Sequence, residues 1–325
     1  MYALGVDVGS VSTNMVLVDH SGEVVEKYYI RTKGRPMEAV QSGFAMLGLK
    51  YHDRQIQAAG TTGSGRTIAA IQIGADIVKN EITAHAVAAI SMDPEVKTIL
   101  EIGGQDSKII LIRDGVVTDF AMNTVCAAGT GSFLDRQAER LGIPIEEFGD
   151  YALKATVPVR IAGRCAVFAE SDMIHKQQLG YDACDIVGGL CDALVRNYLS
   201  NVAKGKEILP KVIFQGGVAA NRGIHKAFEN ALQMPVFIPQ HHDMMGAIGA
   251  AILAREKMQR EKGKTRFKGF SVASSDFQSR SFICNGCTNC CEVVCVLENE
   301  KPIGFFGDRC EKYKGRIPIP QNITN

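Results

Sequence analysis

Two single cysteines stand where a helix is expected to begin. Cys126 lies in NTVCAAGTGSFLD, before small residues and an amphipathic segment, and Cys165 lies in GRCAVFAESDMI, 39 residues further along. The N-terminus of a helix carries free N–H groups and partial positive charge, which favour a thiolate and stabilise an anionic cluster. A buried, unreactive thiol is the alternative, and we accept it for Cys184 and Cys191. For Cys126 and Cys165 we reject it, because both thiols share a position at the start of a helix, where an anionic thiolate or cluster is stabilised.

Six more cysteines crowd the last 45 residues: Cys284, Cys287, Cys290, Cys291, Cys295 and Cys310. The spacing of Cys284, Cys287, Cys290 and Cys295 approaches that of bacterial ferredoxins, although the last gap is one residue longer and no Pro follows. Four thiolates would equally suit Zn²⁺. So short a segment has too little apolar material to fold alone and needs a metal or docking onto the body of the protein. We therefore predict that the tail binds a metal, either as a second iron–sulfur cluster or as zinc.

The chain also contains an internal repeat that places an acid before a glycine turn. At an offset of 94 residues, Asp7 matches Glu101 and Gly9 matches Gly103. In both copies the turn joins two apolar runs that are typical of β-strands. Two copies are too few for a solenoid and indicate two related lobes that face one ligand.

These glycine turns could bind the phosphates of a nucleotide through their backbone N–H groups. A carboxylate just before such a turn can hold Mg²⁺ through water, or orient a water for attack on the γ-phosphorus. Asp7 and Glu101 fit these catalytic roles, and Gln105 and Asp106 add polar reach. A third turn, Gly216-Gly217, follows the apolar run KVIFQ. One such turn alone would be an ordinary hairpin, but three in this order predict a nucleotide site.

The order of the three turns resembles that in the actin, sugar-kinase and heat-shock-chaperone ATPase superfamily. The resemblance implies an α/β fold in which two duplicated lobes, with mixed sheets flanked by helices, close on ATP or ADP with Mg²⁺. It assigns nucleotide contacts to the three turns and their flanks: Gly9, Ser10, Ser12, Gly103, Gly104, Asp106, Gly216, Gly217 and Asn221.

Five segments make the resemblance more specific: LGVDVGS, EIGGQDSK, NTVCAAGTGSFLD, GRCAVFAESDMI and QGGVAANRG. In this order they are similar to the activators (component A, or archerase) of 2-hydroxyacyl-CoA dehydratases. They are also similar to ATPase subunits of benzoyl-CoA reductase and to the reductase of double-cubane cluster proteins. The likeness covers residues 1–257 and implies that each subunit gives two thiolates, from Cys126 and Cys165, to one 4Fe–4S cluster on the axis of a homodimer.

The resemblance implies an ATPase coupled to electron transfer, with Asp7, Glu101 and Gln105 as catalytic residues. Its partners would be an upstream ferredoxin or flavodoxin and an electron-accepting iron–sulfur enzyme. Two alternatives stay open: a small-molecule, sugar-type kinase of the same superfamily, and a nucleotide-gated interaction module with a zinc-binding tail. Neither alternative gives the paired thiols a redox function.

Two features depart from these patterns. The family commonly has a basic residue in the first phosphate turn, where this chain has Asn14, so neutralising the phosphate charge would rest on Mg²⁺, N–H groups or an Arg from elsewhere. Residues 60–67, GTTGSGRT, match a P-loop except that Arg66 replaces the Lys. We interpret this segment as a glycine-rich turn and not as a second nucleotide site.

Composition and length set the remaining expectations. The chain has 325 residues, 46% hydrophobic and 22% charged, which predicts more than one domain. We expect lobes at 1–90 and 91–262 and a Cys-rich extension at 263–325. A net charge of +1 gives no electrostatic case for nucleic acid. No apolar run reaches 18 residues and the start lacks a secretory pattern, so we expect a cytoplasmic protein without a membrane partner.

Overall fold

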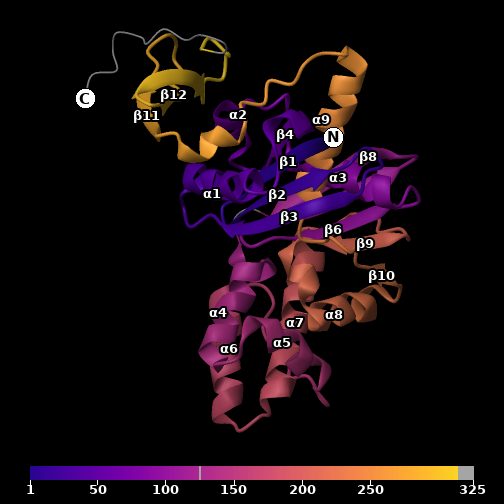
Figure 1. The fold of residues 1–325 in the computed structure, drawn as a ribbon. Helices are drawn as coiled ribbons and strands as arrows, with labels where there is room; N and C mark the ends of the chain where they lie inside the picture. The colour runs from indigo at the N-terminus through magenta and orange to yellow at the C-terminus, as the bar shows by residue number, and fades with distance from the viewer. Residues whose placement is uncertain (124–125, 314–325) are drawn as a thin grey trace. The chain divides into compact units, whose positions relative to one another are not determined.

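The computed structural model describes residues 1–123 and 126–313. The chain divides into two compact units, shown in Figure 1. The first unit contains Met1–Ala84 and the chain from Gly246 onward, and the second is His85–Met245. Residues 246–261 therefore belong to the first unit. The division expected from the sequence assigns them to the second lobe.

The first unit is built on a five-stranded sheet with the order β3-β2-β1-β4-β5. Its strands are β1 (Tyr2–Val8), β2 (Ser12–Val18), β3 (Val24–Arg31), β4 (Ile56–Thr62) and β5 (Ile77–Val78). The first three are antiparallel neighbours, and β4 and β5 run parallel to β1. The carboxyl ends of β1 and β4 therefore share one edge, and Asp7 lies at that edge.

Helices of the first unit are α1 (Pro36–Gly48), α2 (Arg66–Ile73), the start of α3 (Glu81–Met92) and α9 (Met245–Glu261), with the 3-10 turn η1 (Asp53–Gln55). Helix α1 has Pro36 in its first turn, where the missing proline N–H costs no helical hydrogen bond. Val40, Phe44 and Leu47 of this helix are buried in the core of the unit.

Helix α9 packs unusually close to the sheet because glycines line the contact. A Cβ added at Gly5 of β1 would lie 1.8 Å from the carbonyl oxygen of Ala247, and one at Gly60 of β4 would lie 2.2 Å from that of Ala250. Both distances are far below van der Waals contact. The backbone of α9 thus lies directly on β1 and β4, which explains why this helix belongs to the first unit.

The second unit repeats the first sheet. Its strands are β6 (Thr98–Ile102), β7 (Ser107–Arg113), β8 (Val116–Asn123), β9 (Val212–Gln215) and β10 (Val236–Phe237). Their order, β10-β9-β6-β7-β8, and their directions reproduce those of the first sheet. Even the register is shared, since Asp7 pairs with Asn14 and Glu101 pairs with Lys108. The duplication expected from the sequence is confirmed.

The second unit also carries a helical layer: α4 (Gly131–Leu141), α5 (Ile145–Leu153), α6 (Ala166–Gln178), α7 (Ala183–Asn201) and α8 (Arg222–Leu232), with turns η2 (Ala127–Gly129) and η3 (Gly217–Ala220). Helices α5, α7 and α8 pack against one another (Figure 1). The ring of Phe228 meets those of Tyr198 and Phe214 edge to face, at centroid distances of 5.3 and 5.0 Å. These rings join α7 and α8 to strand β9.

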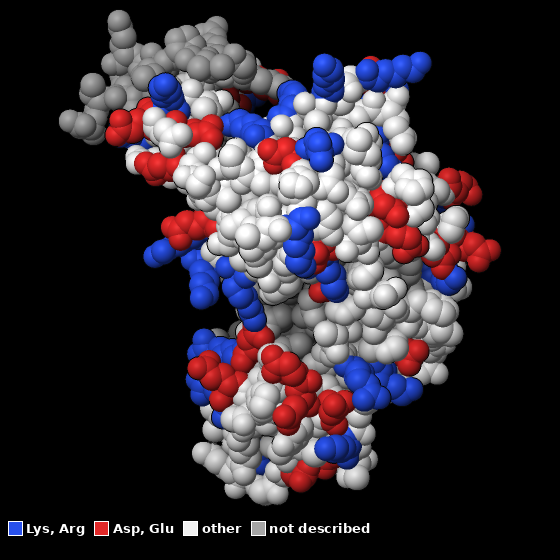
Figure 2. All heavy atoms as spheres, in the orientation of Figure 1, with Lys and Arg blue, Asp and Glu red and all other residues white. Residues whose placement is uncertain are grey.

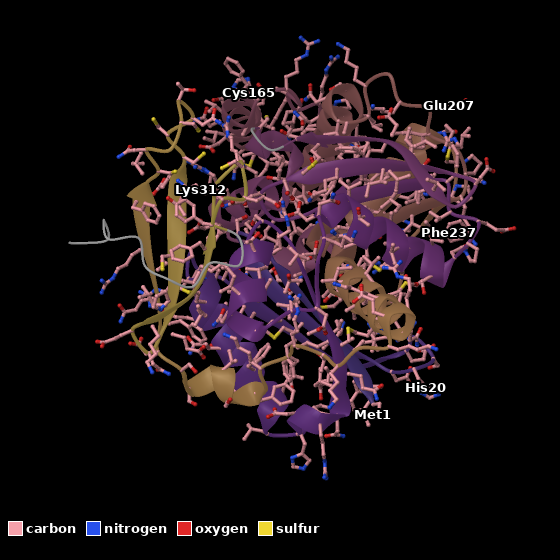
Figure 3. All side chains as sticks on the ribbon, turned by 90° about the horizontal axis from the view of Figure 1, so that it is seen from above. Met1, His20, Cys165, Glu207, Phe237 and Lys312 are labelled. Atoms are coloured by element: carbon pink, nitrogen blue, oxygen red, sulfur yellow. The ribbon has the colours of Figure 1, made fainter. Side chains whose placement is uncertain are left out.

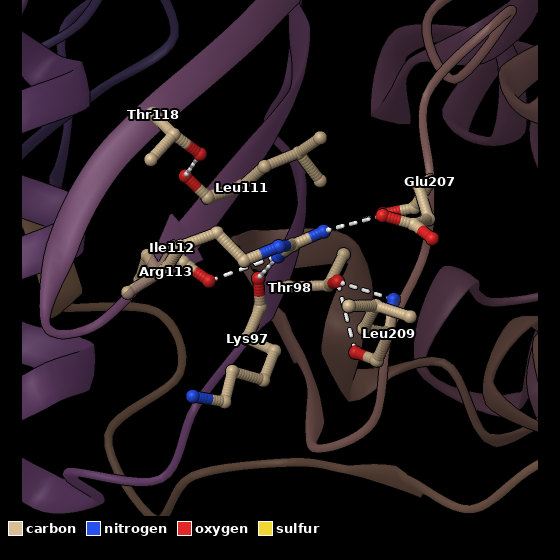
Figure 4. A network of polar contacts seen from close by, with 8 residues as sticks. All are labelled: Lys97, Thr98, Leu111, Ile112, Arg113, Thr118, Glu207 and Leu209. Carbon is tan, nitrogen blue, oxygen red and sulfur yellow. Dashed lines mark hydrogen bonds and ion pairs between the residues drawn. The ribbon is translucent and has the colours of Figure 1, made fainter.

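A polar network fixes the connection before β9 to the sheet (Figure 4). The Arg113 guanidinium donates to the carbonyl oxygens of Lys97 and Glu207, both at 3.0 Å. The Thr98 hydroxyl donates to the carbonyl of Leu209 at 3.0 Å and accepts from its N–H at 3.1 Å. These bonds satisfy backbone N–H and carbonyl groups of the loop. They lie at the end of the sheet that is opposite to Glu101.

The C-terminal extension forms a three-stranded antiparallel sheet that belongs to the first unit. The turn η4 (Phe270–Ser274) leads into β11 (Phe277–Ile283), β12 (Glu292–Glu298) and β13 (Lys301–Phe306). The small core of this sheet contains Val293, Leu297 and Phe305.

Hydrogen bonds hold the start of the extension against the rest of the first unit. The carboxylate of Asp76, 3% exposed, accepts from the Thr265 hydroxyl at 2.7 Å and from the Arg266 N–H at 2.8 Å. The Gln41 amide donates to the carbonyl of Ser275 at 2.7 Å. Docking onto the first unit therefore stabilises this segment, which has too little apolar material to fold alone.

Acidic and basic side chains are interspersed over the face shown in Figure 2, in keeping with the net charge of +1. None of the helices in the described part of the chain is long and apolar enough to cross a membrane.

The close packing of α9 gives a test of the fold. The change Gly5→Ala puts a methyl group into the α9 backbone, so we expect it to lower the free energy of unfolding by about 3 kcal/mol or more. Urea unfolding followed by circular dichroism measures this loss. Gly263→Ala is the control, because its Cβ would meet only the Met258 methyl, at 3.5 Å. Equal urea concentrations at the midpoint of unfolding for the two variants would contradict the close contact between Gly5 and α9.

Candidate functional site

The first predicted phosphate turn is a tight hairpin between β1 and β2. The N–H of Gly9 donates to the carbonyl oxygen of Ser12 at 2.8 Å. Asp7 is half-buried at the end of β1, directly opposite Asn14 in the register. The hairpin thus holds a carboxylate beside a turn whose backbone can face an anion.

Thr32 anchors this hairpin, and sequence reasoning missed it. The side chain of Thr32 is buried; its hydroxyl donates to the carbonyl oxygen of Gly9 at 2.9 Å and lies 3.1 Å from the hydroxyl of Thr13. The Thr32 N–H donates to the carbonyl of Val11 at 2.9 Å. A threonine after an edge strand carries no motif, so only the pairing of β2 with β3 reveals this role.

The second predicted turn has the same geometry and adds a buried ion pair. The Gly103 N–H donates to the carbonyl of Asp106 at 3.0 Å, as Gly9 does to Ser12. The Lys108 ammonium lies 3.0 Å from the Glu101 carboxylate and 2.9 Å from that of Asp106. Lys108 and Glu101 are each about 95% buried. Lys108 therefore holds the Glu101 carboxylate in a fixed position.

The other residues predicted in the second turn surround this pair. The N–H groups of Gly131 and Ser132, at the start of α4, donate to the carbonyl oxygens of Gly103 and Gly104 at 2.9 and 2.8 Å. The side chain of Gln105 is exposed at the tip of the turn. Helix α4 thus fixes the backbone of the turn while Gln105 faces solvent.

The third predicted turn, after β9, contacts the second. Gly216 has a φ of +93°, and a Cβ there would lie 2.3 Å from the carbonyl oxygen of Ile102 and 2.8 Å from the Glu101 carboxylate. Gly217 has open space around it. Asn221 caps α8 by accepting from the Ile224 N–H at 3.0 Å, which leaves its buried Nδ2 without a hydrogen-bond partner among the described residues. An open glycine beside an unsatisfied amide fits a bound nucleotide.

The segment 60–67, the glycine-rich turn whose spacing resembles a P-loop, lies against Asp7. Gly63 has a φ of +91°, and a Cβ there would lie 2.4 Å from the carbonyl oxygen of Val8 and 2.5 Å from the Asp7 carboxylate. These contacts match those of Gly216 with Ile102 and Glu101 in the second unit. Gly63 is therefore the counterpart of Gly216, and each unit places a left-handed glycine against its carboxylate.

The structure brings Cys126 and Cys165 to one place in the second unit. The Cys126 thiol lies 3.9 Å from the carbonyl oxygen of Arg164, the residue before Cys165. Cys165 is the N-cap of α6, as expected, whereas Cys126 precedes the short turn η2 and not α4 itself. Both thiols are half-buried.

Two asparagines hold the cysteine segments, and neither was found from the sequence. Asn123 clamps Cys126 by accepting from its N–H at 2.9 Å and donating to its carbonyl at 2.8 Å. The buried Asn197 of α7 donates to the carbonyl of Gly163, and its Oδ1 lies 2.7 Å from the position of a Cβ on Gly129. Asn197 thus contacts the loop of Cys165 and the loop of Cys126.

The tail cysteines occupy two kinds of environment. Cys284 is buried at the end of β11, and an N–H bond from Gly286, the Tyr313 hydroxyl and the Lys312 charge together lower the pKa of its thiol. Cys295 is 1% exposed inside β12, and burial raises the pKa of its thiol. The predicted ligands Cys287 and Cys290 are exposed.

Known proteins resemble this chain over most of its length. Residues 4–254 match the model of the BadF/BadG/BcrA/BcrD ATPase family. The chain is 33% identical over 261 residues to the (R)-2-hydroxyglutaryl-CoA dehydratase activating ATPase of Acidaminococcus fermentans, covering 79% of this chain and 98% of that one. It is 33% identical over 265 residues to the activator of lactoyl-CoA dehydratase of Anaerotignum propionicum, covering 80% of this chain and 100% of the relative.

Among solved structures, the activator of the 2-hydroxyisocaproyl-CoA dehydratase from Clostridium difficile with bound ADPNP superposes with a TM-score of 0.74. The two chains are 29% identical, and the match covers 81% of this chain and 97% of the other. The expected fold is confirmed for the two duplicated units.

His85 makes the second unit sensitive to acid. Burial, with the charge of Lys108, lowers the pKa of His85 from 6.5 to about 3, and the neutral ring pairs with the Gln215 amide at 2.7 Å. Below pH 6.5 the His85 ring takes up a proton in the unfolded chain but stays neutral in the folded chain. The free energy of unfolding therefore decreases as the pH is lowered from 6.5 towards 3. Between pH 6.5 and 5, the wild type should lose about 1.5 kcal/mol more than His85→Gln.

Urea unfolding at the two pH values measures this difference. His20→Gln, at an exposed position, is the control and should follow the wild type. Parallel losses of stability in the wild type and in His85→Gln would show that His85 is not kept neutral by burial.

The contact of Gly63 with Asp7 predicts a catalytic defect. In Gly63→Ala the new Cβ would press on the Val8 carbonyl and on the Asp7 carboxylate, so the carboxylate must shift. A displacement near 1 Å lowers a rate by up to about 100-fold. We expect ATP hydrolysis to fall by at least about tenfold. Gly34→Ala is the matched control, because Gly34 has a similar φ of +71° with open space around it. Steady-state assays in which both variants hydrolyse ATP equally would refute the positioning role of Gly63.

Proposed function

Because this chain belongs to the BadF/BadG/BcrA/BcrD ATPase family, we propose that it hydrolyses ATP and uses the reaction to pass low-potential electrons to a partner enzyme. The partner would be a 2-hydroxyacyl-CoA dehydratase, a benzoyl-CoA reductase-type enzyme or a double-cubane cluster protein. The names of the relatives as dehydratase activators support this class of partner. The observation that carries the proposal is the approach of the Cys126 thiol, at 3.9 Å, to the carbonyl oxygen just before Cys165.

The two hairpins are proposed to bind the phosphates of ATP with Mg²⁺. Backbone N–H groups of the turns would face the phosphate oxygens. Asp7 would hold Mg²⁺ through water, and Glu101 would orient the attacking water, with Gln105 at the exposed tip as a further polar contact. The unsatisfied Asn221 amide and the open Gly217 support adenosine binding at the third turn.

The distribution of charge in the hairpins supports this division of roles. Lys108 occupies the position in the second hairpin that Asn14 occupies in the first. Because Lys108 is buried between two carboxylates, its charge orients Glu101 and Asp106. The first hairpin has no lysine at that position, so we propose that Mg²⁺ near Asp7 neutralises the phosphates there.

Cys126 and Cys165 are proposed to hold one 4Fe–4S cluster shared by two copies of the chain. When bound, such a cluster supplies a one-electron carrier. A cluster usually takes four thiolates and one chain supplies two here, so a symmetric dimer completes the set. Val167 and Phe168, two and three residues after Cys165, are 68% and 67% exposed. Exposed apolar residues at this position support a contact with a second copy.

A ferredoxin or flavodoxin is proposed as the electron donor. A sugar-type kinase is not favoured, because relatives that match nearly their whole length are named as dehydratase activators and because a kinase has no use for the paired thiols. We also propose a metal centre in the C-terminal extension, for which the sequence pointed to Cys284, Cys287, Cys290 and Cys295.

Removing one thiol of the shared pair tests the proposal. Purified without oxygen, Cys126→Ala should lack about four irons per dimer that Cys184→Ala retains. Its affinity for ATP should stay within about twofold of wild type, because Cys126 does not belong to the turns. Iron and sulfide analysis with nucleotide titration gives both readings. Equal iron contents in the two variants would refute the cluster assignment.

A further inference from the structure

The tail sheet gathers five of its six cysteines at one edge. In an antiparallel sheet of three strands, the end of β11, the start of β12 and the end of β13 lie at the same edge. The loop of residues 284–291 joins β11 to β12, and the chain after β13 continues through residues 307–313. Cys284, Cys287, Cys290 and Cys291 lie in the first loop and Cys310 lies in the second.

The two loops are in contact. The Tyr313 hydroxyl lies 3.7 Å from the Cys284 thiol, and the Tyr313 ring packs on Phe282 at a centroid distance of 5.5 Å. A Cβ added at Gly286 would lie 3.1 Å from the Lys312 ammonium and 3.4 Å from the Cys284 thiol. Lys312 lies at one end of the tail sheet in Figure 3. The segment that carries Cys310 is thus held beside Cys284.

Cys295 is too far inside the sheet to join this group. It lies three residues into β12, opposite Arg280 and Phe305 in the register, which is about 10 Å from the edge at the rise of a strand. Sulfur atoms that share one zinc or iron ion lie only about 4 Å apart. Cys295 is 1% exposed and packs in the apolar core of the sheet with Val293 and Leu297. It therefore serves as a core residue.

Cys291, and not its neighbour Cys290, faces Cys284. The N–H of Cys284 donates to the carbonyl oxygen of Cys291 at 2.8 Å, which closes the loop. Cys291 also packs against the cluster that contains Cys284. Cys290 has a φ of +42°, and its thiol approaches the carbonyl of Cys287 at 3.7 Å. Cys290 is exposed and shapes the turn.

We propose that Cys284, Cys287, Cys291 and Cys310 form a tetrathiolate site for a metal that prefers sulfur, as zinc or as iron. This assignment takes up the tail metal centre proposed above and is independent of the shared cluster and of ATP. In the described part of the chain no three His, Cys, Asp or Glu side chains already form a metal-binding group. Metal binding would therefore bring the four thiols closer to one another, starting from the existing contact between Tyr313 and Cys284.

Lys312 suits this site by charge. Four thiolates around a divalent ion leave a net charge of −2, which a nearby ammonium group stabilises. The Lys312 ammonium approaches Gly286, between Cys284 and Cys287 in the sequence. The chain thus offers a cation beside the proposed thiolates.

The experiment uses the full chain with Cys126 and Cys165 both changed to Ser, so that the body site cannot contribute metal. After anaerobic purification, elemental and sulfide analysis should find about one zinc per chain, or iron with or without sulfide. Changing Cys284, Cys287, Cys291 or Cys310 singly to Ser should lower the bound metal at least about tenfold. Cys290→Ser and Cys295→Ala are the matched controls and should keep it within about twofold.

Loss of metal in Cys290→Ser, or full retention in Cys291→Ser or Cys310→Ser, would overturn the ligand set. A protein that is purified without metal and takes up neither Zn²⁺ nor iron with sulfide would overturn the site itself. Neither outcome bears on the shared cluster, which is measured in the chain with Cys126 and Cys165 intact.

Alkylation of the unchanged tail provides a second test that does not require a variant to fold. Iodoacetamide labelling with mass spectrometry should show Cys287, Cys291 and Cys310 protected by metal and labelled after its removal with a chelator. Cys290 should be labelled in both states. Labelling of Cys310 at the same rate with and without metal would contradict the proposal.

Discussion

In each unit, a carboxylate meets the glycine that directly follows the neighbouring parallel strand, so closely that no side chain would fit there. Gly63 is set against Asp7, and Gly216 against Glu101. The parallel pairings of β1 with β4 and of β6 with β9 impose this contact, because they bring the carboxyl ends of the two strands to one edge. The positive φ that both glycines adopt turns the chain away just beyond the carboxylate. The site residues therefore depend on sheet topology more than on any local motif.

Much of this arrangement follows from sequence. The acid-and-glycine repeat at an offset of 94 residues predicted both hairpins, since strand-turn-strand patterns are local and their register is set by the turn. The family resemblance, which rests on five short segments, is borne out by the match over residues 4–254. The role of Gly63 was not predictable in the same way. Its segment resembles a P-loop by spacing, and only the pairing of β4 with β1 shows what it contacts.

The other residues that sequence reasoning missed have one feature in common. They make contacts between segments that lie far apart in the chain. Asn197 reaches Gly163 from the middle of α7, and Thr32 reaches Gly9 across β2. Neither residue type signals such a partner. The three strands of the tail were also not predicted, since cysteine, asparagine and glycine obscure the alternation that marks a strand. Because spacing alone guided the choice of tail ligands, it included Cys295, which the sheet buries in its core.

The duplicated units are alike in backbone and different in charge, and this difference has a consequence for the proposed mechanism. At equivalent positions the first hairpin has Asn14 opposite Asp7, and the second has Lys108 opposite Glu101. A buried lysine held by two carboxylates is costly to move, because separating it would leave charges unpaired in a low-dielectric interior. The second hairpin is thus electrostatically rigid before any nucleotide binds. The first hairpin has an amide, and not an ammonium group, opposite its carboxylate. In the proposed mechanism, Mg²⁺ would therefore supply at the first hairpin the positive charge that Lys108 supplies at the second.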